Sequence, residues 1–230
     1  MFRNNPFHTS FSSIRKHAQR PLTINEIFVV KWLDYNSKYG MGYLLSNGLL
    51  GVIFNDNTQI FSFPQQQDGG YFEYFNQKLK DGKDLLTVFN FKKYPQSLET
   101  KVKLYFYFQE YLEKNRTGVS VISSFLINTT DKENININGN SVAPVYIHRW
   151  MKTEQAIFFK MSNKIVQVIF KDGAMLIINP FENTSRYINK NGEINNSDSN
   201  DPDVDEMLQR VSYVKSELNE AWRSLNVDDS

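Results

Sequence analysis

Histidine is the side chain best suited to acid–base chemistry at neutral pH, and this 230-residue chain has three. His8 and His17 lie in a basic N-terminal stretch, and His148 lies in the apolar run VYIHRW. The sequence contains no GxSxG or HExxH motif, no glycine-rich phosphate loop and no spaced pair of carboxylates. We therefore interpret His148 as an ordinary strand residue, and we expect that this chain is not an enzyme.

The acidic run from Asp201 to Glu206 has the charge of a calcium-binding loop but not its pattern. It lacks the central glycine and the distal glutamate that such a loop uses. The chain has no cysteine, which excludes a thiolate zinc site, a cysteine nucleophile and a disulfide framework. We expect no metal ion and no cofactor in this chain.

The charge and hydropathy of the sequence narrow the classes of protein to which this chain can belong. Lys and Arg number 26 against 25 Asp and Glu, a net charge of +1, which argues against a nucleic-acid-binding protein. No apolar run is long enough to span a membrane, and the first residues lack the apolar stretch of a secretory signal. We expect a soluble, intracellular globular chain with no nucleic-acid or membrane partner.

Short apolar runs separated by Gly or Asn begin at Ile27, a texture typical of antiparallel hairpins. Asn47-Gly48 predicts a tight primed turn between two strands. A helix is predicted next, with Ser97 as its cap. Its apolar residues recur at helical spacing: Leu98, Val102, Tyr105, Phe108 and Leu112.

The second half of the chain repeats this order of strands followed by a helix. Four apolar runs between Val145 and Pro180 predict strands. The final helix has Asp201 as its candidate cap and Pro202 at its first position. One face of it is apolar: Met207, Val211, Val214, Leu218 and Trp222.

A shift of 116 residues aligns the two halves. It matches Val52-Ile53-Phe54 with Val168-Ile169-Phe170, and Asp56 with Asp172, among eight identities over 26 positions. We infer a duplication. The predicted organisation is a basic arm at 1–26, a first unit at 27–115, a linker at 116–142 and a second unit at 143–226. The apolar stretch Val119–Ile127 in the linker could pack against one of the units.

Two segments carry a resemblance to a known family. VVKWLDYNSKYGMGYLLSNGLLGVIFNDNTQIF (Val29 to Phe61) resembles the first polo box of polo-like kinases, and RWMKTEQAIFFKMSNKIVQVIFKDGAMLIINP (Arg149 to Pro180) is similar to the second. The resemblance implies an α+β fold with two polo boxes. Each box would be a six-stranded antiparallel sheet with a C-terminal helix, and the two would pack as a β-sandwich with a cleft between them.

The resemblance also implies a function and a ligand site. The chain would be the non-catalytic targeting region of a Ser/Thr kinase, with ATP and Mg²⁺ needed only by the kinase domain. Trp32 matches the tryptophan that packs on a bound peptide, and Leu33 and Asp34 match its neighbours on a strand that pairs with peptide backbone. Arg116 and Phe170 fall at further positions of the same cleft.

The family's phosphate-binding His and Lys correspond to Gly173 and Met175 here, and neither side chain can donate a hydrogen bond to phosphate. Three alternatives follow from this departure. The cleft takes an unphosphorylated peptide, which we favour, or phosphate binding survives through other cations, or the module chiefly dimerises or holds its own kinase domain inactive. The replacement cations would be Arg116, Lys171 and Arg149.

The expected partners are therefore protein peptides, phosphorylated or not, and the parent kinase domain. We expect a monomer or a weak homodimer. The resemblance implies a cytoplasmic or nuclear protein targeted to the centrosome, basal body, spindle pole or kinetochore.

Overall fold

The computed structural model describes residues 27–63, 70–76, 85–114, 120–121, 144–182, 184–193 and 203–225. They belong to two compact units that divide between Ile147 and His148, which we call the N-terminal and the C-terminal unit. The predicted basic arm, most of the predicted linker and the predicted cap Asp201-Pro202 lie outside the described residues.

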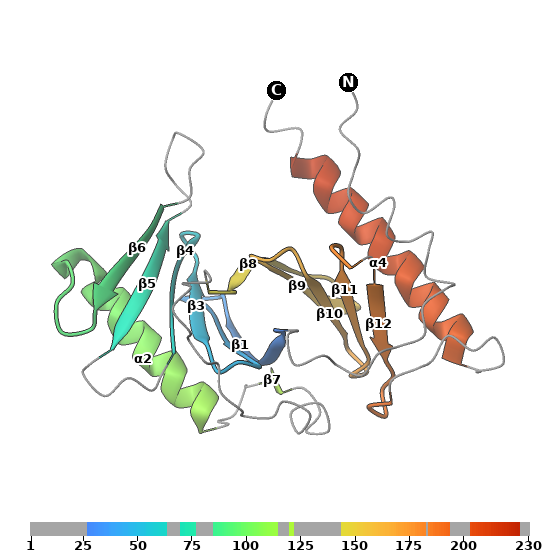
Figure 1. Ribbon diagram of the computed structural model, residues 1–230, viewed down its shortest axis with the longest axis horizontal. Coiled ribbons are helices and arrows are strands. Elements are labelled where there is room, and N and C mark those ends of the chain that lie inside the picture. The colour runs from blue at the N-terminus through green and yellow to red at the C-terminus, as the bar shows by residue number, and fades with distance from the viewer. Residues whose placement is uncertain are drawn as a thin grey trace. The chain divides into compact units, whose positions relative to one another are not determined.

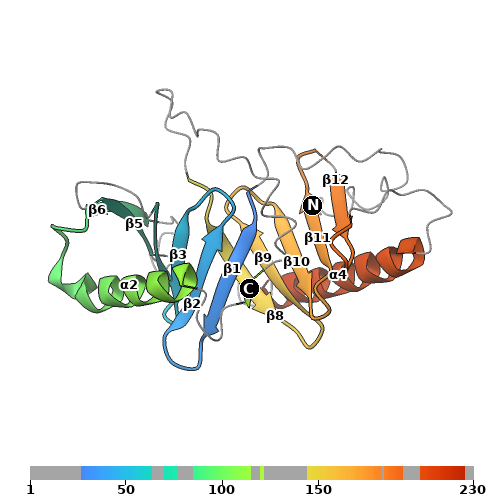
Figure 2. The ribbon, with the colours of Figure 1, turned by 90° about the horizontal axis from the view of Figure 1, so that it is seen from below.

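The N-terminal unit is an antiparallel sheet with one helix across a face (Figures 1 and 2). The strand order in the sheet is β6-β5-β4-β3-β2-β1-β7. Its elements are β1 (Val29–Tyr35), β2 (Gly40–Leu45), β3 (Leu50–Phe54), β4 (Thr58–Ser62), β5 (Tyr71–Asn76), β6 (Leu85–Asn90), the 3₁₀ turn η1 (Gln96–Leu98), α2 (Glu99–Glu113) and β7 (Ser120–Val121).

The predicted apolar stripe of α2 forms the core beneath it. Val102, Tyr105, Phe108 and Leu112 are buried against Leu33, Val52, Ile60 and Phe72 of the sheet. Phe108 lies directly on Gly42, where a Cβ would come within 2.4 Å of the ring, so this close approach requires glycine. The predicted cap was wrong: Ser97 lies inside η1, and Leu98 takes the cap position of α2 without a side-chain hydrogen bond.

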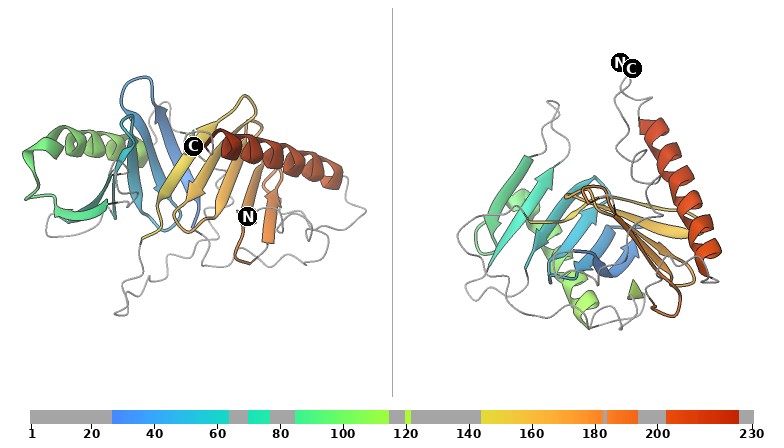
Figure 3. Two further views of the ribbon diagram at one scale, coloured as in Figure 1. Left: turned by 90° about the horizontal axis from the view of Figure 1, so that it is seen from above. Right: turned by 45° about the vertical axis from the view of Figure 1, so that its right-hand side comes forward.

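The C-terminal unit repeats the plan. Its strands are β8 (Ile147–Lys152), β9 (Ala156–Met161), β10 (Val166–Phe170), β11 (Met175–Asn179) and β12 (Thr184–Ile188), in the order β12-β11-β10-β9-β8. Helix α4 (Asp203–Leu225) runs along this sheet (Figure 3). Met207, Val211 and Val214 are buried against it, and Leu218 is partly buried there, as predicted.

These observations confirm the predicted α+β class and the order of sheet then helix in each half. The strand number differs from the six expected in each sheet, because the described residues form seven and five. The first sheet gains β7 from the predicted linker. In the second, a hydrogen-bonded turn from Asn189 to Glu193 follows β12, and the next residues lie outside the described ranges.

The duplication extends to the turns. The β2–β3 turn closes with Gly48 at φ 85°, and the β9–β10 turn closes with Lys164 at φ 68°, 116 residues later. Because Asn47 has no positive φ, the first turn is not the primed turn expected but a three-residue loop ending in a left-handed glycine. None of the helices described is long and apolar enough to cross a bilayer.

Candidate functional site

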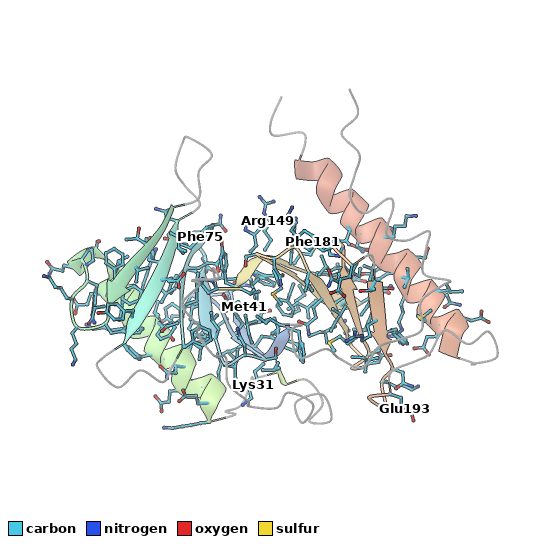
Figure 4. All side chains as sticks on the ribbon, in the orientation of Figure 1. Lys31, Met41, Phe75, Arg149, Phe181 and Glu193 are labelled. Atoms are coloured by element: carbon cyan, nitrogen blue, oxygen red, sulfur yellow. The ribbon has the colours of Figure 1, made fainter. Side chains whose placement is uncertain are left out.

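The outer edge of β1 already accepts a strand. On one side β1 pairs with β2, which places Trp32 opposite Tyr43. On the other side it pairs antiparallel with β7, with Lys31 opposite Val121 and Trp32 opposite Ser120. Figures 1 and 4 show β7 beside the lower end of β1, close to Lys31. This edge is therefore able to bind an extended segment through backbone hydrogen bonds.

The three predicted residues of β1 divide between the two faces of the sheet, because side chains alternate along a strand. Leu33 is 8% exposed and belongs to the core beneath α2. Trp32 and Asp34 belong to the opposite face, where Trp32 is half-buried. The Asp34 carboxylate accepts the backbone N–H of Asn36 at 3.3 Å. The side chain of Trp32 therefore lies on the face opposite α2, whereas the side chain of Leu33 is in the core.

The C-terminal end of helix α2 contacts strand β1 through a hydrogen bond. The Lys31 ammonium donates to the carbonyl of Leu112 at 3.3 Å. A cation at the C-terminus of a helix also stabilises the helix dipole. The contact fixes the end of α2 beside β1, one residue before the helix ends at Glu113.

Four tyrosines, which we call the tyrosine surface, gather where β1 and its turn meet α2: Tyr35, Tyr39, Tyr107 and Tyr111. The rings of Tyr35 and Tyr39 lie 5.5 Å apart, and those of Tyr107 and Tyr111 lie 4.5 Å apart. A hydrogen bond with Tyr111 raises the pKa of Tyr107 to about 12, with smaller contributions from burial and the other tyrosines. Sequence reasoning missed this surface, although Tyr107 and Tyr111 show the four-residue spacing of helix neighbours.

A second feature unpredicted from sequence is the segment just before β8. Tyr146 stacks on Phe61 at 4.6 Å and packs against Phe75 at 5.4 Å, on the face of the N-terminal sheet opposite α2. The buried hydroxyl of Tyr43 accepts the backbone N–H of Ile147 at 3.3 Å, and burial raises the pKa of that hydroxyl. These contacts hold residues 146–147 on the face that also carries Trp32.

In the C-terminal unit, Gly173 is a turn residue. It adopts φ 92°, and its N–H donates to the carbonyl of Phe170. The next N–H, of Ala174, donates to the Asp172 carboxylate. Both amides are therefore engaged inside the turn rather than directed outward. Asn57 has the same left-handed conformation in the matching turn of the N-terminal unit, 116 residues earlier.

Met175 is buried in β11, at 1% exposure. Its neighbours Ala174 and Leu176 face α4, so its own side chain lies on the opposite face of the sheet. There the Gln167 amide donates to the Met175 sulfur at 3.0 Å. The two positions that would grip phosphate are therefore a glycine turn and an apolar core side chain.

The remaining predicted residues lie in different environments. Phe170 is 7% exposed and packs in the core under α4, with the Arg210 guanidinium 4.6 Å from its ring. Arg149 and Lys171 are exposed, and Figure 4 shows Arg149 at the same end of its sheet as Phe181. Arg116 lies outside the described residues. Within the described ranges, no three His, Asp or Glu side chains gather to hold a metal ion.

Comparisons with known proteins give one consistent family. The model of the POLO box duplicated region matches residues 37–102 and 153–214. The chain is 38% identical over 179 residues to a maize protein named probable serine/threonine-protein kinase CCRP1, covering 78% of this chain and 26% of that protein. It is 29% identical over 181 residues to serine/threonine-protein kinase PLK1 of Xenopus laevis, covering 78% of this chain and 27% of the relative. It thus spans about a quarter of the length of these relatives.

Solved structures give the same fold. The polo-box domain of budding yeast Cdc5, in complex with an Spc72 phosphopeptide, aligns with a TM-score of 0.59 at 19% identity, covering 84% of this chain and 64% of that one. The Cdc5 polo-box domain in complex with the Dbf4 polo-interacting region aligns with a TM-score of 0.58 at 19% identity, covering 83% and 68%.

Proposed function

This chain belongs to the polo-box family, and on that premise we propose that it is a peptide-docking module of a polo-like serine/threonine kinase. The module binds partner peptides along the outer edge of β1, with Trp32 as the side-chain anchor. It brings the attached kinase domain to structures such as the spindle pole or centrosome. The chain itself performs no catalysis.

One observation carries this proposal: the outer edge of β1 takes up an antiparallel strand at Lys31 and Trp32. A peptide added in the same way gains backbone hydrogen bonds whatever its sequence, and side-chain contacts then select among peptides. The half-buried ring of Trp32 stands directly at this edge. Aromatic residues of this kind contribute a large share of the binding energy of an interface.

We also propose that the module binds peptides without cationic side chains that contact a phosphate group. Gly173 and Met175 offer no side-chain donor, and the amides of Gly173 and Ala174 bond within their own turn. Charge-assisted contacts to a phosphate typically contribute about 1.5–3 kcal/mol each, so their absence removes most of the preference for a phosphorylated peptide.

A second candidate function keeps phosphate recognition and assigns it to Lys171. This lysine is exposed and lies in the same turn as Asp172 and Gly173. Under this alternative a phosphorylated peptide would bind far more tightly than its unphosphorylated form, and Lys171→Ala would remove the difference.

The proposed site is tested with short fluorescent peptides that contain a central Ser-phosphoSer or Ser-Ser pair with randomised flanks. Trp32→Ala should weaken binding of either pool about tenfold or more, because it removes the anchor. Trp150→Ala is the matched control, since it removes the same ring from β8 of the other unit. Equal binding by the native chain and Trp32→Ala would place the ligand elsewhere.

A further inference from the structure

The strand that pairs with β1 comes from the chain itself. β7 consists of Ser120 and Val121, and it lies opposite Trp32 and Lys31, where the proposed ligand would add. We propose, resting on the docking function above, that Ser120–Val121 is an internal ligand that occupies the β1 edge and competes with partner peptides. The docking edge is thus closed in the free chain, and a partner must displace β7 to use Trp32 fully.

The length of the ladder makes this contact easy to open. It pairs two residues, whereas β1 is seven residues long and pairs with β2 over nearly its whole length. A short ladder forms few hydrogen bonds, and these must offset the entropy lost in ordering the segment. A partner peptide that continues along β1 toward Tyr35 gains more bonds than β7 gives up.

The chain connection between α2 and β7 has the opposite effect. It favours pairing of β7 with β1 when no partner peptide is present. Only six residues separate the end of α2 at Glu113 from Ser120. The Lys31–Leu112 contact holds the end of that helix next to β1. A segment tethered this close has a high effective concentration at the edge, which favours pairing despite the short ladder.

The sequence of the segment suits the role. Val119–Ile127 reads VSVISSFLI, with four β-branched residues among nine and no charge. Residues of this kind favour strands, and an extended uncharged segment fits a sheet edge. The described pairing involves Ser120 and Val121 of this stretch.

Occupation of the β1 edge by β7 has a measurable consequence for the affinity of partner peptides. When the binding-competent state is only a fraction of the population, the apparent affinity falls by that fraction. Removing the internal ligand should therefore tighten peptide binding, which is the opposite of what a mutation in a supporting strand does.

The test compares Ser120→Pro/Val121→Pro with Ser120→Ala/Val121→Ala. Proline has no N–H to donate to a ladder, whereas alanine keeps the backbone donors of both positions. Hydrogen exchange in β1 should be faster in the proline variant and unchanged in the alanine variant. The proline variant should bind the randomised peptide pools about three- to tenfold more tightly than the native chain.

Two results would overturn the inference: native exchange and affinity in the proline variant, or weaker binding by it, which would make β7 part of the docking surface. Trp32→Ala separates this failure from failure of the docking function. If Trp32→Ala weakens binding while the proline variant equals the native chain, docking stands and the internal ligand does not. If neither variant changes peptide binding, both proposals are wrong.

Discussion

Arg210 of α4 forms a two-pronged ion pair with Asp172 in the β10–β11 turn. Its Nη1 donates to the Asp172 carboxylate at 2.9 Å, its Nη2 donates to the second oxygen, and its guanidinium lies over the ring of Phe170. The N-terminal unit has the same arrangement with other residues. Lys101 of α2 pairs with Asp56 at 2.7 Å and lies 5.4 Å from the ring of Phe54. Each helix is thus clamped to the matching turn of its own sheet.

The first prediction concerns this clamp. Asp172→Asn and Arg210→Gln should each lower the free energy of unfolding by about 1 kcal/mol, because the pair is partly buried and backed by an aromatic ring. Urea denaturation of both single variants and the double variant measures the coupling. Asp56→Asn is the matched variant in the other unit. Strictly additive effects of the two C-terminal substitutions would show that the pair contributes nothing.

The second prediction is a loss of stability in acid. Hydrogen bonds from Arg210 hold the pKa of Asp172 below its usual value. Burial pushes the pKa of Asp56 upward, but hydrogen bonds from Lys101 and Thr58 outweigh it and the pKa is lowered. A carboxyl with a lowered pKa stabilises the folded state above its unfolded pKa of about 3.9, and this contribution is lost as the pH falls through the folded pKa.

Urea midpoints measured from neutral pH downward should therefore fall in native protein below about pH 4. The fall should be shallower in Asp172→Asn, which has no proton to bind at this position. An equal slope in the two proteins would contradict the assignment of the acid sensitivity to this pair.

The third prediction concerns Gly173. Its φ of 92° disfavours residues with a Cβ, although a Cβ there would meet no atom within 4 Å. Asparagine tolerates this backbone region best among such residues, and Asn57 occupies it in the matching turn. Gly173→Asn should be destabilised less than Gly173→Val, which we expect to lose about 1–2 kcal/mol or more. Thermal unfolding of the two variants measures this difference. Equal losses of stability would mean that backbone strain at position 173 is not the cause.

The fourth prediction concerns Met175. Met175→Lys places an ammonium on a side chain that is now 1% exposed, so unfolding free energy should fall by about 3 kcal/mol or more. Met175→Leu preserves volume and polarity and should lose less than about 1.5 kcal/mol. If Met175→Lys proved as stable as native protein, the side chain could reach solvent, and this position could hold a phosphate-binding lysine.

Local signals predicted much of the fold. The spacing of Val102, Tyr105 and Phe108 identified the buried face of α2, and the shift of 116 residues identified two equivalent units. The cap at Ser97 was wrong because η1 precedes the helix, and a 3₁₀ turn has no distinct signature in the residues. The primed turn at Asn47-Gly48 was wrong because one additional residue changes the loop type.

The candidate site was harder to predict from sequence because the residues that contact one another there are far apart in the chain. The pairing of Ser120 with Trp32 and the stacking of Tyr146 on Phe61 join residues that no local pattern relates. Phe170 is a predicted cleft residue whose ring packs in the core under α4, a placement set by strand alternation. Face assignment needs the register of the strand, which sequence alone did not provide.

We propose that this module docks peptides without cationic side chains that bind phosphate, and a single titration can test this. The native chain is titrated with the Ser-phosphoSer pool and with its unphosphorylated twin under identical salt. We predict binding of both with affinities that differ by less than about tenfold, or 1.4 kcal/mol. A preference for the phosphorylated pool well above tenfold, lost in Lys171→Ala, would show that the module does recognise phosphate and would assign this recognition to the β10–β11 turn.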